Sequence, residues 1–168
     1  MPAQALLKRN PKFTAEQFSD AWLEHARLVV PLFLWCGVEV YVQTHAPLTL
    51  ANPAQDLNIS DYDGAATTHL TPSLLALVTK NEQVGIPGWV RRYYEEVVLV
   101  DERRVLVGEA MGHVRMVDEG EGGEVVKGGK RIVVIEKGEL AEGFEGGGDV
   151  WKRYEREGKG EVEGEKEG

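Results

Sequence analysis

Two histidines and the polar residues near them are the side chains best suited to chemistry in this sequence. His45 follows Tyr41 and Gln43 at alternate positions, so a strand would present all three on one face. His25 lies on the apolar side of a predicted helix. Since histidine titrates near neutral pH, we expect His25 and His45 to transfer protons, while Tyr41 and Gln43 hold a phenol or ketone oxygen.

Each of these residues also has a structural interpretation, which the sequence leaves open. His25 can be a core histidine with one ring nitrogen bonded to a backbone carbonyl. Tyr41 and Gln43 can simply form hydrogen bonds within the sheet. The catalytic interpretation of His45 is favoured because three polar residues alternate with apolar ones, which is typical of a polar pocket wall.

A second group of candidates lies farther along the chain. Asp63 is a third catalytic candidate, although its position before Gly64 also suits a β-bulge. His69 shares its face but also fits a strand end, and His113 fits an exposed position better than a pocket. The candidates for substrate binding, with the tryptophans as aromatic walls, are Tyr41, Gln43, Trp22, His69, Trp89 and His113.

The sequence predicts neither a metal site nor a cofactor. None of the four histidines has a partner at the short spacing that metal sites use, and the single cysteine, Cys36, cannot build a thiolate site. The stretch GEVVKGGKR departs from a phosphate-binding loop, because Lys130 precedes Arg131 instead of serine or threonine. We therefore expect chemistry by side chains alone.

The first helix and the strand after it have clear signals. Thr14 and Gln17 form a capping-box pattern, apolar residues then recur every three or four positions, and Pro31 predicts the end of the helix. The period becomes two over residues 38–45, which predicts a strand. Residues 46–61 are rich in proline, asparagine and aspartate and predict a long loop.

The remaining elements follow from similar patterns. Residues 4–10, 62–70 and 112–118 predict strands. Residues 71–80 predict a helix with a threonine cap and proline at its first position. A further helix is predicted at 89–104, with one face made of Trp89, Tyr93, Val97 and Val100.

This order of elements predicts the fold class. Strand, helix, strand, strand, helix, strand is typical of a ferredoxin-like α+β fold, with the helices on one face of an antiparallel sheet. The other face of the sheet then needs a cover. Because no further helix is predicted to provide it, we expect a second copy of the chain to pack there and form a homodimer.

Four short motifs occur in order along the first two thirds of the chain. They are a helical segment with Phe18, Trp22, His25 and Ala26, a strand with Tyr41, Gln43 and His45, the run Tyr62-Asp63-Gly64, and a helix that ends in Asp101 and Glu102. In this order they resemble the EthD family of dimeric α+β barrel proteins, and especially its fungal members. The resemblance covers residues 5–117 approximately.

The resemblance implies a pocket between the sheet and its helices in each protomer of a dimer, with chemistry that needs no cofactor. Fungal members of the family include decarboxylases of aromatic polyketide carboxylic acids. Similar folds serve polyketide cyclases, dehydratases, muconolactone isomerases and cofactor-independent oxygenases, so the family indicates the fold better than the reaction. The loop at 46–61 and the extension after residue 118 depart from the family pattern, which affects pocket depth and any lid.

Composition divides the chain. The net charge is -9, of which -6 falls from Asp118 onward (15 acidic against 9 basic residues), and this part also holds 14 of the 20 glycines. We expect a domain at 1–117, a Gly/Glu-rich extension at 118–154 with an extra strand at 130–137, and a disordered acidic tail at 155–168.

An acidic chain without a basic stripe or a long apolar run predicts a soluble, cytoplasmic protein that binds neither nucleic acid nor membrane.

Together these observations predict an enzyme of fungal aromatic polyketide biosynthesis with a small aromatic substrate. The most concrete reaction is cofactor-independent decarboxylation of a β-keto or ortho-hydroxy acid, with His45 or His25 as the proton donor. Cyclisation, dehydration and cofactor-free oxygenation are alternatives that would use the same residues. A further alternative is a non-catalytic dimeric module that binds a small ligand or a partner, in which both histidines are structural.

Overall fold

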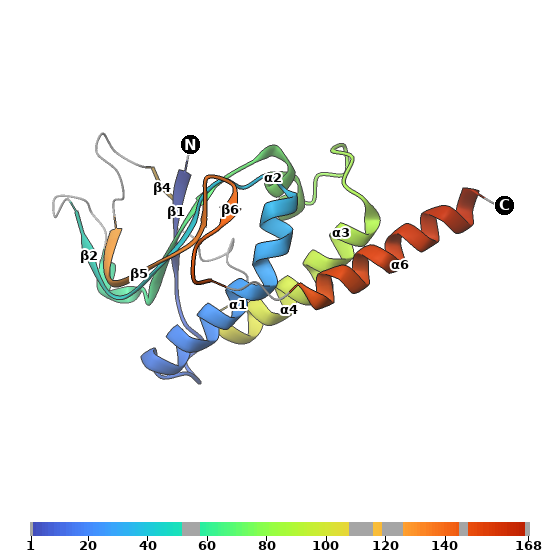
Figure 1. Ribbon diagram of the computed structural model, residues 1–168. Helices are drawn as coiled ribbons and strands as arrows, with labels where there is room; N and C mark the ends of the chain where they lie inside the picture. The colour runs from blue at the N-terminus through green and yellow to red at the C-terminus, as the bar shows by residue number, and fades with distance from the viewer. Residues whose placement is uncertain (1, 52–57, 108–115, 119–125, 145–147, 167–168) are drawn as a thin grey trace.

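The computed structural model describes residues 2–51, 58–107, 116–118, 126–144 and 148–166. In these residues the chain is α+β, with an open antiparallel sheet on one side and the helices on the other (Figure 1). The strands are β1 (Pro2–Leu7), β2 (Tyr41–Leu50), β3 (Gly64–His69), β4 (Met116–Asp118), β5 (Val126–Glu136) and β6 (Glu139–Leu140). Their order in the sheet, β4-β1-β3-β2-β5-β6, is compatible with the predicted ferredoxin-like fold.

The helical segments account for most of the remaining described residues. They are α1 (Ala15–Trp35), η1 (Ile59–Asp61), α2 (Pro72–Val78), α3 (Gly88–Tyr93), η2 (Tyr94–Val98), α4 (Leu99–Val105) and α6 (Asp149–Lys166). The segments α3, η2 and α4 follow one another without a break, so they form one long helix with a π-helical turn in the middle. No helix in the described part of the chain is long and apolar enough to cross a membrane.

Helix α1 begins where the capping box predicts. The Thr14 hydroxyl accepts a hydrogen bond from the backbone N–H of Gln17 at 3.1 Å, and the side-chain oxygen of Gln17 accepts one from the Thr14 N–H at 2.9 Å. The predicted end at Pro31 is wrong, because α1 continues past it. Buried residues on both sides of the proline, such as Val30 and Leu32, hold the last turn in place despite one lost backbone hydrogen bond.

The helix predicted at 89–104 is present, but the residues on its buried face differ in part from those expected. The backbone is π-helical over Tyr94–Val98, and a π turn contains more residues than an α turn. The next buried residue after Tyr93 is therefore Val98, five positions later. Val100, which was expected to face inward, is 55% exposed. This shift turns Glu102 toward the sheet.

Part of the loop predicted at 46–61 is strand. β2 extends into it, past a β-bulge between His45 and Leu48, and β5 pairs with β2 on both sides of the bulge. A Cβ atom at Gly128 of β5 would lie 2.5 Å from the His45 carbonyl oxygen, so only glycine allows this close approach. The extra strand predicted at 130–137 is present, is longer than expected and belongs to the same sheet as β1, β2 and β3.

Several residues on the face of the sheet that points away from the helices are buried within the chain. Leu6 and Ala65 are fully buried there in one cluster with Val126. The side-chain amide of Gln4 binds both backbone groups of Val126, with its oxygen 2.8 Å from the N–H and its nitrogen 3.1 Å from the carbonyl. Among the described residues, Leu6, Ala65 and Val126 are therefore buried without a second copy of the chain, and the homodimer remains a prediction.

The acidic tail, expected to be disordered from residue 155, is helical to the end of α6 (Figure 1). The ring of Trp151 packs edge-on against Trp89, with 4.9 Å between ring centroids. A Cβ atom at Gly158 would lie 2.3 Å from atoms of the same tryptophan, so this glycine lets the helix approach closely. Trp151, Tyr154 and Gly158 recur at helical spacing and make α6 one-sided, a pattern that the charged composition conceals.

Candidate active site

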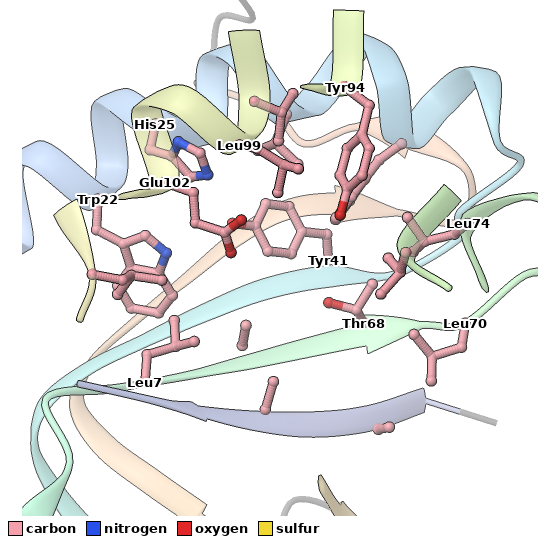
Figure 2. A pocket seen from close by; sticks show the side chains of 18 residues that line it. Leu7, Trp22, His25, Tyr41, Thr68, Leu70, Leu74, Tyr94, Leu99 and Glu102 are labelled. Atoms are coloured by element: carbon pink, nitrogen blue, oxygen red, sulfur yellow. The ribbon is translucent and has the colours of Figure 1, made fainter. Parts of the chain in front are cut away.

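A cavity of about 160 Å³ lies between the sheet and the helices. Small residues of β1 and β3 form its floor, and α1, α2, η2 and α4 form its walls (Figure 2). Most of the lining is apolar. The polar and charged side chains that line it are His25, Tyr41, Thr68, Tyr94 and Glu102.

His25 is held by a carboxylate from another helix. Its Nδ1 lies 2.8 Å from Oδ2 of Asp101, and the other oxygen of Asp101 accepts a hydrogen bond from Nε of Arg104 at 3.0 Å. Because an ionised carboxylate only accepts hydrogen bonds, Nδ1 carries the proton, which leaves Nε2 as the basic nitrogen of the neutral ring. The ring points into the cavity toward Glu102 (Figure 2), so this nitrogen can reach a bound molecule.

The environment keeps Asp101 ionised. Burial by itself raises the pKa of Asp101, but the hydrogen bonds and charges of His25 and Arg104 act in the opposite direction and leave the pKa below its ordinary value. A carboxylate that stays charged holds the imidazole in one tautomer and stabilises the imidazolium when the ring takes up a proton.

Tyr41 supplies a neutral hydroxyl to the cavity. Burial raises its pKa above the usual range, the hydrogen bond from Gln43 lowers it, and the charge of Glu102 raises it further. The Tyr41 oxygen accepts a hydrogen bond from Nε2 of Gln43 at 3.0 Å, so the phenolic proton remains for donation to another group. Figure 2 places Tyr41 and Glu102 side by side at the cavity.

A chain of hydrogen bonds holds Tyr41 in position, and the donor and acceptor of each bond can be assigned. Nε2 of Gln43 also donates to the backbone carbonyl of Trp22 at 3.0 Å, a group that can only accept, so the orientation of the Gln43 amide is determined. Its oxygen then accepts from Nε2 of His45 at 2.9 Å. Nδ1 of His45 is left to accept from the hydroxyl of Ser19 at 2.6 Å. The chain runs from Ser19 to the Tyr41 hydroxyl.

His45 is a member of this chain and does not line the cavity. Burial, and then the charge of Lys130, lower its pKa to about 4, while Asp20 acts weakly in the other direction. A histidine that is neutral and uses both ring nitrogens is a poor acid or base, so the position of His45 does not suit the proton transfer that was predicted for it.

Trp22 lies between His45 and the cavity. Its ring lines the cavity and is 4.7 Å from the imidazole of His45, measured between ring centroids. A Cβ atom at Gly64 would lie 2.7 Å from the Trp22 ring, so the glycine of the Tyr62-Asp63-Gly64 run makes room for the tryptophan. The predicted role of Trp22 as an aromatic wall fits this position.

The other predicted site residues do not line the cavity. Asp63 binds Arg9, with Oδ1 3.1 Å from Nε and Oδ2 3.0 Å from the backbone N–H, and so ties the end of β1 to β3. His69 ends β3 outside the lining, and Trp89 packs against α6. His113 lies outside the described residues.

Four residues of the site were not predicted as functional. They are Thr68, Tyr94, Asp101 and Glu102, from β3, η2 and α4. The spacing of four between Tyr94, Val98 and Glu102 is a helical signal that places a carboxylate on an otherwise apolar face. That signal could have found Glu102, whereas the pairing of Asp101 with α1 needs the tertiary structure.

The described residues hold no group of three or more histidine, cysteine, aspartate or glutamate side chains arranged to bind a metal ion.

Comparison with known proteins adds no relative. No family model, no curated protein and no solved structure matches this chain. The inference of function therefore depends on the cavity and its residues.

Proposed function

We propose that the cavity is the active site of an enzyme that moves protons on a small carbonyl or phenolic compound, using side chains alone. One observation carries the proposal: His25 faces an apolar cavity while its Nδ1 is bound to Asp101 at 2.8 Å. A buried histidine oriented by a carboxylate is a recurring arrangement for general acid–base catalysis.

The described residues can carry a complete reaction. Nε2 of His25 removes a proton from the carbon next to a carbonyl group, and the electron pair of that C–H bond moves onto the carbonyl oxygen. The neutral hydroxyl of Tyr41 donates a hydrogen bond to this oxygen. The imidazolium, stabilised by Asp101, then returns the proton to a hydroxyl on the next carbon, whose C–O bond breaks as water leaves and a C=C bond forms.

Ring closure uses the same first step. If the enolate carbon attacks a second carbonyl of the same molecule, a C–C bond forms and His25 protonates the new alkoxide. Both reactions start from a neutral substrate and need one base, one hydrogen-bond donor and an enclosed apolar space. We therefore propose dehydration or cyclisation as the first candidate.

Decarboxylation of a β-keto or ortho-hydroxy acid, the reaction expected from the sequence, is the second candidate. Loss of CO2 also leaves an enolate, which Tyr41 can hold and His25 can protonate. An apolar lining would assist the loss of CO2, because a charged group is converted into neutral products, but Glu102 in the same lining disfavours binding of the carboxylate, so this reaction stands second. In this scheme the proton comes from His25, and His45 positions Tyr41 through Gln43.

The resemblance to EthD proteins supports this class of chemistry. We keep as proposals the dimeric barrel, the homodimer and a place in aromatic polyketide metabolism. The cavity is lined by residues of one chain, so the proposed chemistry does not require a second copy.

A mass-spectrometric screen tests the proposal. Single-ring aromatic β-hydroxy ketones, diketones and β-keto acids are incubated, with chelator present, with the wild type, His25→Gln and the matched control His69→Gln. A product lighter by water, or rearranged at equal mass, that requires His25 supports the first candidate, and loss of CO2 supports the second. Unchanged compounds that still bind contradict an enzyme and favour the non-catalytic module.

A further inference from the structure

We propose that Glu102 makes the cavity selective for neutral, one-ring ligands with a hydroxyl or carbonyl oxygen, and that it excludes the corresponding carboxylates. The inference rests on the proposed function, because it places the ligand in the same cavity. It adds the charge and the size of the substrate and names the residue that sets them.

The size of the cavity fits a ligand with one ring. Its volume of about 160 Å³ is close to the roughly 150 Å³ of an apolar protein cavity that holds benzene. Two walls of the cavity are tied in place, since the Tyr93 hydroxyl donates to the Leu28 carbonyl at 2.6 Å and Trp22 packs on Gly64. A fused ring system would therefore extend beyond this volume toward the open side of the cavity, or displace side chains that line it.

The charges around the cavity disfavour an anion. Glu102 points into it (Figure 2), and Asp101, the residue before Glu102 on α4, binds Nδ1 of His25. Burial and then the charge of Glu102 raise the pKa of Tyr41, so that charge is felt at the hydroxyl. Arg104 is bound to Asp101, and the described lining residues include no lysine or arginine. Among the described lining residues, only a protonated His25 could offset the charge of a buried carboxylate ligand that lies beside Glu102.

The same residues fit a neutral oxygen-bearing ligand. A carboxylate has two oxygens that can each accept more than one hydrogen bond, so Glu102 can accept a ligand hydroxyl beside its existing interactions. The Tyr41 hydroxyl can donate to a carbonyl oxygen, and Thr68 can do either. A phenol that carries a ketone matches both requirements within one ring.

Binding of two compounds of nearly equal size and different charge tests the proposal. We would titrate the full-length wild type at pH 7 with 3-hydroxyacetophenone, which is neutral, and with 3-hydroxybenzoate, which is an anion, and follow the protein by NMR. The neutral compound is expected to bind at least about tenfold more tightly. Equal affinities, or tighter binding of the anion, would overturn the proposal without the need for any variant.

Two variants assign the selectivity to Glu102. Glu102→Gln is expected to reduce the ratio of the two affinities by at least about fivefold, since it removes the charge and keeps the shape. Glu95→Gln, an equal change on the same long helix at an exposed position outside the lining, is expected to leave the ratio as it is. A ratio that is unchanged in a folded Glu102→Gln protein would overturn the assignment.

The ligand proposal and the catalytic proposal fail separately. His25→Gln should abolish turnover while it preserves the preference for the neutral compound, because the charge of Glu102 is still present. Selectivity without turnover would contradict the enzyme and keep the ligand class. Turnover of a carboxylate in a wild type that prefers carboxylates would contradict the ligand class and keep the enzyme.

Discussion

Nδ1 of His25 lies 2.8 Å from a carboxylate oxygen of Asp101, although 76 positions separate the two residues. The pair joins α1 to α4 and brings one histidine nitrogen to the carboxylate and the other to the cavity. It depends on the π turn at Tyr94–Val98, which alters the register of the long helix just before Asp101.

Replacing Asp101 by asparagine should reduce catalysis more than stability. The amide no longer fixes the tautomer of His25 or stabilises the imidazolium, so we expect kcat/KM to fall by about 10²-fold. The measurement is the pH profile of kcat/KM with the substrate found by the screen. Asp63→Asn is the matched control because it also breaks a carboxylate ion pair, with Arg9, outside the cavity. Equal losses of activity in both variants would contradict the role of Asp101.

The buried position of His45 predicts how stability depends on pH. Its pKa is about 4 in the folded protein against 6.5 when unperturbed, so between these values the unfolded chain binds more protons. The free energy of unfolding should therefore fall on acidification from pH 6.5 to 4, by on the order of 2 kcal/mol from this group. Denaturant titrations at several pH values measure the slope.

Two histidine variants test whether His45 causes this dependence of stability on pH. His45→Gln should reduce the loss of stability on acidification, whereas His69→Gln should leave it close to that of the wild type. The prediction fails if the slope for His45→Gln matches that of the wild type.

Two glycines on α6 give a stringent test of its docking. Gly158→Ala places a Cβ 2.3 Å from Trp89 atoms and should destabilise the protein by about 1–3 kcal/mol through overpacking. Gly160→Ala, with nothing within 4 Å, should stabilise by roughly 0.5–1 kcal/mol, since alanine is the better helix former. Chemical denaturation and limited proteolysis of the C-terminal segment report both effects. Equal shifts in the two variants would mean that α6 is not docked as described.

Gly64→Ala tests the position of Trp22. Its Cβ would lie 2.7 Å from the indole ring, so the ring must shift at a cost of about 1–3 kcal/mol. Since Trp22 lines the cavity, affinity for 3-hydroxyacetophenone should also fall. Gly88→Ala, which has open space for a Cβ at the start of α3, is the control and should change neither quantity by a comparable amount. Unchanged ligand affinity in Gly64→Ala would contradict the placement of the ring.

Local signals in the sequence predicted part of the fold. The capping box at Thr14 placed the start of α1, and alternation over 38–45 predicted β2, because each depends on residues close together in the chain. The predictions were wrong where the structure depends on contacts between residues that are far apart in the sequence. Gly128 fits against His45 across two strands, and Gly158 fits against Trp89 across two helices, so neither glycine indicates its partner in the sequence.

The site was predicted in outline. The helical period placed His25 inward, and alternation placed Tyr41, Gln43 and His45 on one face of β2. Alternation alone could not distinguish the tyrosine that meets the cavity from the histidine that lies behind the Trp22 ring. Glu102 was named only as the end of a helix, because the face expected for that helix, with Trp89, Tyr93, Val97 and Val100, does not contain it.

The most direct test of His25 as a base is proton exchange, which needs no knowledge of the natural substrate. The methyl hydrogens of 3-hydroxyacetophenone, next to its carbonyl, are followed by NMR in D2O with chelator present. We predict that the wild type accelerates their replacement by deuterium by at least about 10²-fold over buffer, that His25→Gln abolishes this acceleration, and that His69→Gln keeps it. Exchange no faster than in buffer while the compound is bound, or undiminished exchange in a folded His25→Gln protein, would contradict catalysis by His25.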